Sequence, residues 1–321
     1  MPSILLTNYY SKAILSLIKK EVPPGFTVIS LDSSSKEEVR QKAAESDYFL
    51  VGGRIKIDKY VIENAPRLKM VQRSGVGMDS VDLDVLKARN IPVYINHGVN
   101  SRSVAEHTLM LMLSVLRRLN ISDSSLKKGD WVKHELGVQN FELFGKTVGL
   151  IGMGNIGECV AEMLTSFGTN TLYFKPNRLS QEKEDKLGLS YRSFEKLLSE
   201  SDIVSIHCSL NDQTRSIIGD KEFKSMKGGS FIINTSRGAI IDEKALVKNL
   251  KSGHLSGAGL DVYEQEPLPA DSYLRELDNV ILTPHIGGIT HESFTAMIRS
   301  AFRNISLYEN GELELIERNK I

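Results

Sequence analysis

The sequence is poor in cysteine, with only Cys159 and Cys208 among its 321 residues. The two residues lie far apart and form no Cys-x-x-Cys pair, which argues against a disulfide framework and against a zinc site. The histidines have no neighbouring ligand residues that would complete a metal set. We therefore predict that the protein binds no metal.

The sequence also has no excess of charge of either sign, since 40 Lys and Arg residues balance 40 Asp and Glu residues. This balance predicts no global electrostatic field that would attract nucleic acid or an acidic membrane. No apolar run reaches about 18 residues, so no membrane span is expected. The N-terminus lacks the basic region and apolar stretch of a signal peptide. We expect a cytoplasmic protein.

Short apolar runs alternate with helix-like segments along the chain, a pattern typical of parallel α/β layers. The first series of runs lies at Ile4–Thr7, Val28–Leu31, Tyr48–Val51, Met70–Gln72 and Val93–Asn96. The second lies at Thr147–Ile151, Thr171–Phe174, Ile203–His207, Ser230–Asn234, Ala258–Val262 and Val280–Leu282. Runs rich in Ile and Val and free of charge are expected of strands that helices cover on both faces.

Three further segments indicate how the two series are organised into domains. Ser101–Arg118 is apolar around most of its circumference, so we predict a buried helix with Ser101 as its N-cap. Asn120–Phe144 is more polar, and we expect it to pack over the second domain. Glu292–Tyr308 has helical spacing of apolar residues and is expected to return to the first domain. The predicted domains are 1–98 plus 290–321, and 99–289.

The loop after Thr147–Ile151 contains Gly152-Met-Gly154-Asn-Ile-Gly157, the pattern Gly-x-Gly-x-x-Gly between a strand and a helix. In a dinucleotide-binding fold the first glycine permits a tight turn and the second lets the backbone approach a pyrophosphate. The third lets the helix pack closely on the strand. The alternative is a glycine-rich turn that binds no nucleotide. We predict a Rossmann-type dinucleotide site.

The next predicted strand ends at Lys175, where many NAD-binding domains have an acid for the ribose 2′-hydroxyl group. Arg178 follows, and no carboxylate appears before Glu182. Two cations at this place would attract the 2′-phosphate of NADP. This hypothesis of NADP preference competes equally with a simpler one, in which both residues are solvated loop charges.

Three motifs follow predicted strands of the second series: Asn234-Thr-Ser-Arg237-Gly238, Asp261-Val-Tyr-Glu-Gln-Glu266-Pro267 and Thr283-Pro-His285-Ile-Gly287-Gly288. Together they contain what hydride transfer to a 2-oxo acid requires. An arginine grips the carboxylate and the carbonyl oxygen, and a histidine donates a proton near neutral pH. A carboxylate beside that histidine would orient its ring. We predict Arg237, Glu266 and His285 as the catalytic residues.

These motifs make the chain similar to the D-isomer-specific 2-hydroxyacid dehydrogenase family, which includes hydroxypyruvate and glyoxylate reductases and phosphoglycerate dehydrogenases. The similarity also covers Leu68–Asp82, Ser103–His107 and Gly129–Trp131. It implies two Rossmann-like, doubly wound parallel-sheet domains with the active site in the cleft between them. Residues 1–98 and 290–321 would form a flavodoxin-like substrate domain and residues 99–289 the dinucleotide-binding domain. Members of the family usually dimerise through the cofactor domain, so a homodimer is expected.

The resemblance assigns His285 as the acid/base, Glu266 as its partner and Arg237 as a substrate ligand. Asp261 would lie near the nicotinamide carboxamide, and the backbone of Val76 and Gly77 would bind the substrate carboxylate. Gly53 and Arg54 would lie near a distal group of the substrate, although a solvated surface arginine is the simpler interpretation. The predicted cofactor-binding residues are Gly152, Gly154, Asn155, Ile156, Gly157, Lys175, Arg178, His207, Thr214, Thr235, Asp261 and Gly287.

The predicted function is reversible hydride transfer between NAD or NADP and C2 of a small 2-oxo acid. A formate dehydrogenase is disfavoured, because those members have glutamine at the position of Glu266. Phosphite oxidation is a second alternative that the sequence leaves open. A third is a dehydrogenase-like NAD(H) sensor or corepressor, which the balanced charge disfavours.

Overall fold

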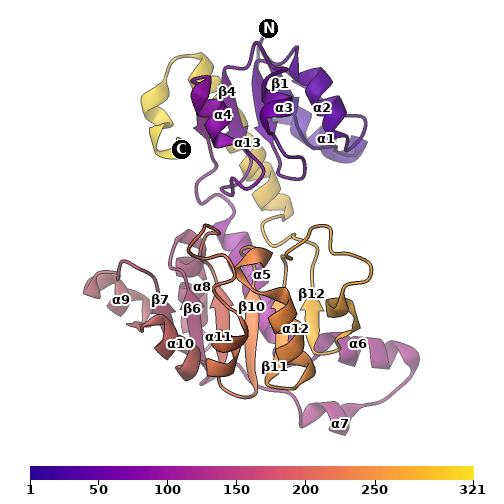
Figure 1. Cartoon of the computed structure of the whole chain (residues 1–321), viewed down its shortest axis with the longest axis vertical. Coiled ribbons are helices and arrows are strands. Elements are labelled where there is room, and N and C mark those ends of the chain that lie inside the picture. Colours follow the sequence, from indigo (N-terminus) through magenta and orange to yellow (C-terminus); the bar gives the residue numbers. More distant parts are fainter. The chain divides into compact units, whose positions relative to one another are not determined.

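The computed structural model describes residues 1–321 as two compact units (Figure 1). Unit 1 comprises Met1–Asn100 and His291–Ile321, and unit 2 comprises Ser101–Thr290. Each unit consists of a single parallel β-sheet with helices packed against it. The predicted α/β class with two parallel sheets is therefore confirmed.

The sheet of unit 1 has five strands in the order β2-β1-β3-β4-β5, which is the order of flavodoxin-like folds. The strands are β1 (Ser3–Leu6), β2 (Thr27–Ile29), β3 (Tyr48–Val51), β4 (Met70–Arg73) and β5 (Val93–Tyr94), and all pair in parallel. The helices are α1 (Lys12–Lys20), α2 (Lys36–Ala43), α3 (Lys59–Ile62), α4 (Leu83–Ala88) and α13 (His291–Glu309), and the last residues form η3 (Leu313–Leu315) and η4 (Glu317–Asn319).

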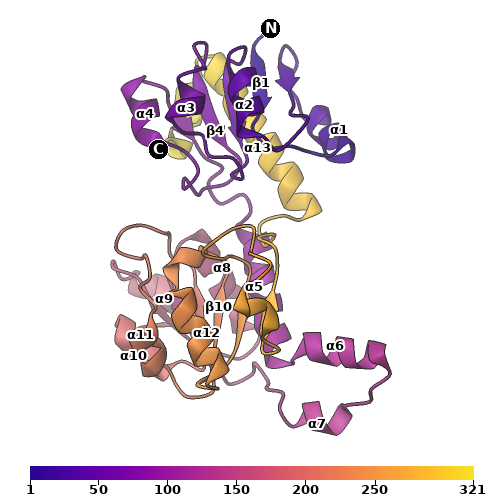
Figure 2. The same ribbon diagram turned by 45° about the vertical axis from the view of Figure 1, so that its right-hand side comes forward.

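Helix α13 completes the core of unit 1, as its apolar spacing predicts. Its Phe302 and Ile305 are buried in one cluster with Tyr48 of β3 and Ile4 of β1. The Asn304 side chain donates a hydrogen bond of 3.1 Å to Gln72 of the buried strand β4. Unit 1 is therefore built from both ends of the chain, which Figure 2 shows by the yellow helix against the indigo elements.

The sheet of unit 2 has seven parallel strands in the order β12-β11-β10-β9-β6-β7-β8. They are β6 (Thr147–Ile151), β7 (Asn170–Phe174), β8 (Leu189–Tyr191), β9 (Ile203–Ile206), β10 (Ser230–Asn234), β11 (Leu255–Leu260) and β12 (Val280–Leu282). Its helices are α5 (Ser101–Leu116), α6 (Leu119–Lys128), α7 (Lys133–Gly137), α8 (Asn155–Thr165), α9 (Gln181–Leu187), α10 (Phe194–Glu200), α11 (Asp220–Ser225) and α12 (Glu243–Lys251), with the short turns η1 (Gly238–Ile240) and η2 (Tyr273–Glu276).

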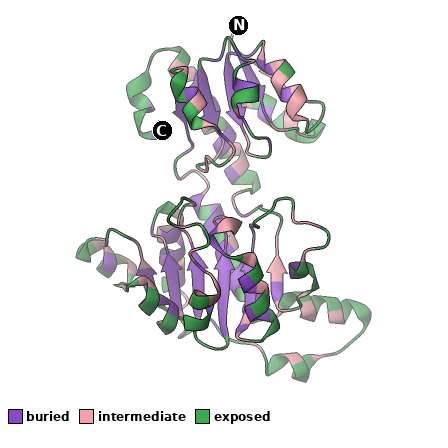
Figure 3. Ribbon diagram, in the orientation of Figure 1, coloured by how far each residue is buried: buried purple, intermediate pink, exposed green.

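The strand order of unit 2 reverses at β6, whose neighbours are β7 and β9. Ligands of open α/β sheets bind outside the carboxyl ends of the strands at such a switch point. Burial is concentrated in the strands, and the outward faces of the helices are exposed (Figure 3). The loops that follow the strands are therefore where a site is expected in this unit.

Three predictions for unit 2 need correction. The edge strand β8 was not predicted, because a run of three residues gives no periodic signal. Helix α5 begins at Ser101 itself, so this residue is not the N-cap. Residues 121–139 do not pack over the domain: they form most of α6 and all of α7, with Trp131 78% exposed, whereas Phe141 packs on Phe231 and Leu143 is buried in the core of unit 2. Figure 2 shows these two helices extending from the body of unit 2.

No helix of the structure combines the length and the apolar character that crossing a membrane requires. The cytoplasmic location stays a prediction.

Candidate active site

The glycine loop joins β6 to α8 in unit 2. Gly152 has φ +96°, and a Cβ atom there would overlap the backbone of Cys208, which follows the neighbouring strand β9. A Cβ atom on Gly157 would lie 2.5 Å from the carbonyl oxygen of Gly152. A Cβ atom on Gly154 would have no neighbouring atom within 4 Å. Gly152 and Gly157 thus permit close backbone packing, and Gly154 faces open space.

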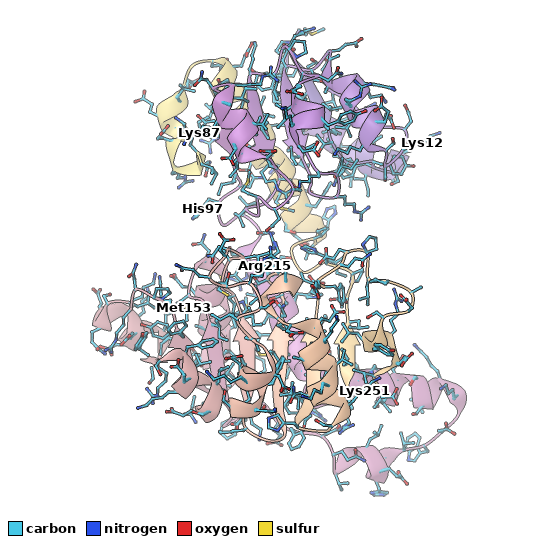
Figure 4. All side chains as sticks on the ribbon, viewed as in Figure 1. Lys12, Lys87, His97, Met153, Arg215 and Lys251 are labelled. Atoms are coloured by element: carbon cyan, nitrogen blue, oxygen red, sulfur yellow. The ribbon has the colours of Figure 1, made fainter.

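The open position of Gly154 adjoins the N-terminus of α8, which begins with Asn155 and Ile156. The first N–H groups of a helix have no partner within it, and together with the helix dipole they favour an anion. The predicted cofactor residues at this turn therefore lie where they could hold a pyrophosphate. Met153 of the same loop is labelled in unit 2 in Figure 4.

The two cations after β7 have specific partners. The Nζ atom of Lys175 donates to the carbonyl oxygen of Met153 at 3.3 Å. Arg178 donates from Nε and Nη2 to both carboxylate oxygens of Glu184, at 2.8 and 2.7 Å. Glu184 is only 2% exposed, and its bonds with Arg178 and Tyr173 lower its pKa to about 2. Arg178 is therefore held in a fixed orientation by a buried carboxylate, not merely solvated.

The loop after β9 contains two predicted cofactor residues, His207 and Thr214. Burial lowers the pKa of His207 to about 4, so its ring is neutral near pH 7, and Nε2 is bonded to Ser205. The Thr214 hydroxyl donates to the Ser209 carbonyl at 2.7 Å and so closes a turn. Burial raises the pKa of the Cys208 thiol to about 11, which makes it an unreactive packing residue.

The predicted catalytic pair, His285 and Glu266, lies on the loops after β11 and β12. The Nδ1 atom of His285 and the Oε2 atom of Glu266 are 2.6 Å apart, and the Oε1 atom of Glu266 accepts the Tyr263 N–H at 3.1 Å. Because Glu266 engages Nδ1, the Nε2 atom of His285 is available to a ligand. The side chain of His285 is 47% exposed. The carboxylate thus fixes which ring nitrogen of the histidine can act.

Arg237 follows β10, the strand next to β11. Its Nη1 atom donates to the Ser236 carbonyl at 2.7 Å, and its own carbonyl accepts from the Asn234 amide at 2.9 Å. A Cβ atom on the next residue, Gly238, would overlap the backbone of Tyr263. The loop that carries Arg237 therefore packs directly on Tyr263, whose N–H group is bonded to the Glu266 side chain.

Asp261 lies at the end of β11 and is 2% exposed. Its carboxylate accepts from the Thr283 hydroxyl at 2.6 Å and from the N–H groups of Ile286 and Gly287 at 2.9 and 2.8 Å. Burial alone would raise the pKa of Asp261, but these bonds and a further hydrogen bond with the His107 side chain lower that pKa. The carboxylate therefore organises the loop around His285, a role that the sequence did not indicate.

Unit 1 contains the predicted substrate residues on loops after β3 and β4. Gly53 has φ +110°, Arg54 is exposed, and no chain atom bonds the N–H groups of Val76 and Gly77. The carbonyl of Gly77 instead accepts from Nε of Arg73 at 2.6 Å. Because Arg73 also donates to the carbonyl oxygen of Val51 at 2.9 Å, this buried guanidinium joins the loop after β4 to the end of β3.

Several residues of both sites were missed by the sequence reasoning. Arg73 could have been found as a charge within an apolar run. Ser103 and His107 could have been found as a polar i, i+4 pair on an apolar helix. In unit 1, Asn8 and Tyr10 follow β1 beside the Gly52–Arg54 loop, and burial raises the pKa of Tyr10. No local signal marks Asn8 or Tyr10.

Comparison with known proteins places the chain among dehydrogenases. Residues 109–287 match the model of the D-isomer specific 2-hydroxyacid dehydrogenase, NAD binding domain. Glyoxylate reductase of Thermococcus litoralis is 36% identical over 97% of this chain and 95% of that protein. D-3-phosphoglycerate dehydrogenase of Archaeoglobus fulgidus is 35% identical over 90% of this chain and 54% of that protein. The structure of D-lactate dehydrogenase from Aquifex aeolicus complexed with NAD and lactic acid matches with a TM-score of 0.85 and 28% identity, covering 99% of this chain and 98% of that one.

The glycine loop yields a contrast between two substitutions. Gly154→Ala should leave the thermal midpoint unchanged, because its Cβ meets open space, yet should weaken dinucleotide binding by about tenfold, or 1.4 kcal/mol. Gly152→Ala should destabilise the fold by about 2 kcal/mol, because it forces a side chain into a left-handed, crowded position. Thermal unfolding and NADH titration by fluorescence measure both. Wild-type NADH affinity in a folded Gly154→Ala protein would contradict the assignment.

Proposed function

The chain belongs to the D-isomer specific 2-hydroxyacid dehydrogenase family, and from that premise we propose that it interconverts a small 2-oxo acid and its 2-hydroxy acid. It is an NAD-dependent oxidoreductase acting on CH–OH donors. The observation that carries the proposal is the 2.6 Å bond between His285 and Glu266, which leaves Nε2 of an exposed imidazole for a substrate. The pair lies at the carboxyl ends of strands in the sheet that also holds the glycine loop.

The residues of unit 2 fit a nicotinamide dinucleotide, since Gly154 leaves open space beside the N-terminus of α8. When bound, the nicotinamide supplies or accepts the hydride. In reduction, His285 donates a proton from Nε2 to the carbonyl oxygen, and Glu266 stabilises the ring through Nδ1. Arg237 binds the substrate and stabilises the negative charge on that oxygen. In oxidation, Nε2 of His285 takes the proton of the hydroxyl group.

In unit 1 we assign the substrate carboxylate to the N–H groups of Val76 and Gly77. Two adjacent donors without chain partners suit the two oxygens of a carboxylate, and Arg73 holds the loop in place through Gly77. Gly53 and Arg54 would face the group attached to the 2-oxo acid. The exposed Arg54 guanidinium favours a substrate whose distal end is polar or anionic.

The mechanism predicts that His285→Ala abolishes turnover while the dinucleotide still binds. A positioned general acid contributes about 10²–10⁴-fold to the rate, and the imidazole is bonded to Glu266 and not to the glycine loop. Steady-state NADH oxidation and NADH titration measure the two properties. His254→Ala is the control, because His254 precedes β11 at the opposite end of the sheet. Full activity of His285→Ala would remove the mechanism.

For the cofactor we propose weak discrimination between NADH and NADPH. The strand end has a lysine in place of an acid, so nothing at position 175 would repel a 2′-phosphate. The bonds of Arg178 to Glu184 use Nε and Nη2, which leaves Nη1 for a phosphate oxygen. The family relatives argue for NAD, and Glu184 offsets part of the positive charge, so we do not expect NADPH to be used alone.

An activity panel tests substrate and cofactor together. NADH and NADPH oxidation are measured with glyoxylate, hydroxypyruvate, pyruvate, and bulkier aliphatic and aromatic 2-oxo acids. We expect turnover with both cofactors, and Lys175→Ala should raise the KM for NADPH by about tenfold, since it removes one charged hydrogen bond, without changing that for NADH. Lys186→Ala, an exposed lysine of α9, is the control.

Two results of this panel would correct the proposal. A strong NADH preference in the wild-type protein would refute the cofactor assignment. Tight dinucleotide binding without turnover of any 2-oxo acid would instead favour a sensor or corepressor, and phosphite is included as a donor to test the remaining alternative.

We also propose a homodimer formed through the arm of unit 2, residues 117–146. The arm carries large apolar side chains that the chain itself leaves exposed: Leu119, Leu126, Trp131, Val138 and Phe144, at 55 to 86%. Exposed apolar patches on one segment are typical of protein interfaces. The occupant is a second copy of the chain, as the family resemblance implies.

The dimer is tested by light scattering coupled to gel filtration. Trp131→Asp combined with Val138→Asp should convert the dimer to a monomer, because two charges would be buried without partners. Leu315→Asp, which alters an exposed apolar residue of unit 1, should leave the dimer intact. A wild-type protein that elutes as a monomer at micromolar concentration would contradict the proposal.

A further inference from the structure

Helix α5 presents polar side chains to the loops of the candidate active site. Ser103 donates to the Gly287 carbonyl at 2.8 Å, and Nε2 of His107 lies 2.9 Å from the Thr283 hydroxyl. Thr108 is bonded to Thr235 at 2.9 Å. The helix is otherwise apolar and largely buried, so these contacts are where α5 meets the loops after β10 and β12.

The direction of the hydrogen bonds around Thr283 follows from its single hydroxyl proton. That proton is donated to Oδ1 of Asp261 at 2.6 Å, since a carboxylate of lowered pKa can only accept. The Thr283 oxygen must therefore accept from His107, whose Nε2 atom carries a proton. The same nitrogen lies 3.4 Å from Oδ1 of Asp261. The order of donation is His107 to Thr283 to Asp261.

This chain of bonds holds residues on both sides of His285 in the sequence. Thr283 precedes His285 by two residues, and Asp261 accepts from the N–H group of Ile286, which follows it. His285 has φ +53°, a left-handed conformation that a non-glycine residue adopts only where its surroundings hold it. The hydrogen bonds of Thr283 and Ile286 to Asp261 fix the backbone on either side of His285 and so stabilise this conformation.

We propose that His107 is a positioning residue of the dehydrogenase, acting through Thr283 and Asp261 to fix the loop that presents His285. The proposal rests on the proposed function. It goes beyond the assignment of Asp261 to the cofactor, because it gives a role to a residue of α5 that the proposed mechanism does not use. Packing supports it, since a Cβ atom on Gly287 would lie 3.0 Å from Asp261 and 3.2 Å from the His107 ring, so the three groups lie against one another.

The requirement at position 107 is a donor at the place of Nε2. A glutamine amide nitrogen can occupy that place, whereas leucine fills a similar volume without a donor. His107→Leu leaves the Thr283 oxygen without its donor and allows the loop to shift. A misplacement of the reacting group by about 1 Å can cost 10²-fold in rate. We expect kcat to fall ~10- to 100-fold in His107→Leu and to recover to within about threefold in His107→Gln.

Four variants of the full-length protein test the proposal: His107→Leu, His107→Gln, Thr283→Val and the double variant His107→Leu/Thr283→Val. Measurements are kcat and KM with the best 2-oxo acid, NADH affinity and the thermal midpoint. If both residues act through one chain of bonds, the double variant should lose no more kcat than Thr283→Val alone. Ser114→Ala, a buried polar residue further along α5, is the control.

A merely structural histidine gives a different pattern. In that case His107→Leu would lower the thermal midpoint and leave kcat per folded molecule unchanged, or its effect would add to that of Thr283→Val; either result overturns the proposal. Failure of glutamine to restore kcat in a folded protein overturns it too. Where His107→Leu does not fold, equal kcat in Thr283→Val and the wild-type protein refutes the chain of bonds. Wild-type turnover, together with loss of turnover in His285→Ala, separates these outcomes from failure of the proposed function.

Discussion

The hydrogen bonds that the buried carboxylate of Asp261 accepts hold together the loops on which the site of unit 2 depends. A carboxylate removed from water is costly unless its oxygens are bonded, and here Thr283, Ile286 and Gly287 all donate to it. Those residues surround His285, so the free energy that compensates for burying Asp261 also fixes the imidazole. The hydrogen bonds to the buried Asp261 thus hold in place the loop that carries the exposed His285.

The parallel sheet explains why such a network can form at all. Parallel strands bring their carboxyl ends to one edge, so residues 237, 261 and 285 become neighbours in the sheet although they lie up to 48 positions apart in the chain. This much could be predicted from sequence. β6, β10 and β12 have the predicted bounds, because each is an isolated run of apolar residues between polar segments. β8 and the arm helices were missed or misplaced, because short or amphipathic segments depend on what packs against them.

The candidate site divides in the same way. Arg237, Glu266 and His285 belong to motifs that can be recognised along the chain. Thr283, His107 and Glu184 act through partners that only folding brings near, and nothing in the local sequence of Glu184 distinguishes it from the other acids of α9. Arg178 shows the consequence: the sequence presents a loop cation, whereas the structure pairs this exposed arginine with a buried carboxylate. Charge counted from sequence therefore overstates the field that a ligand would meet.

Each unit has a glycine that no larger residue could replace at the point where the strand order of its sheet reverses. In unit 2, a side chain at Gly152 after β6 would overlap Cys208 after β9; in unit 1, one at Gly52 after β3 would overlap Asn8 after β1. In each unit the two strands are neighbours that lie at the centre of the strand order. In unit 2 the overlap is with backbone, so the two loops pass closely there, whereas in unit 1 it is with the side chain of Asn8, which fills the space beside Gly52. In unit 1 the Oδ1 atom of Asn8 is buried without a partner, which places an unsatisfied acceptor beside the loop of Gly53 and Arg54.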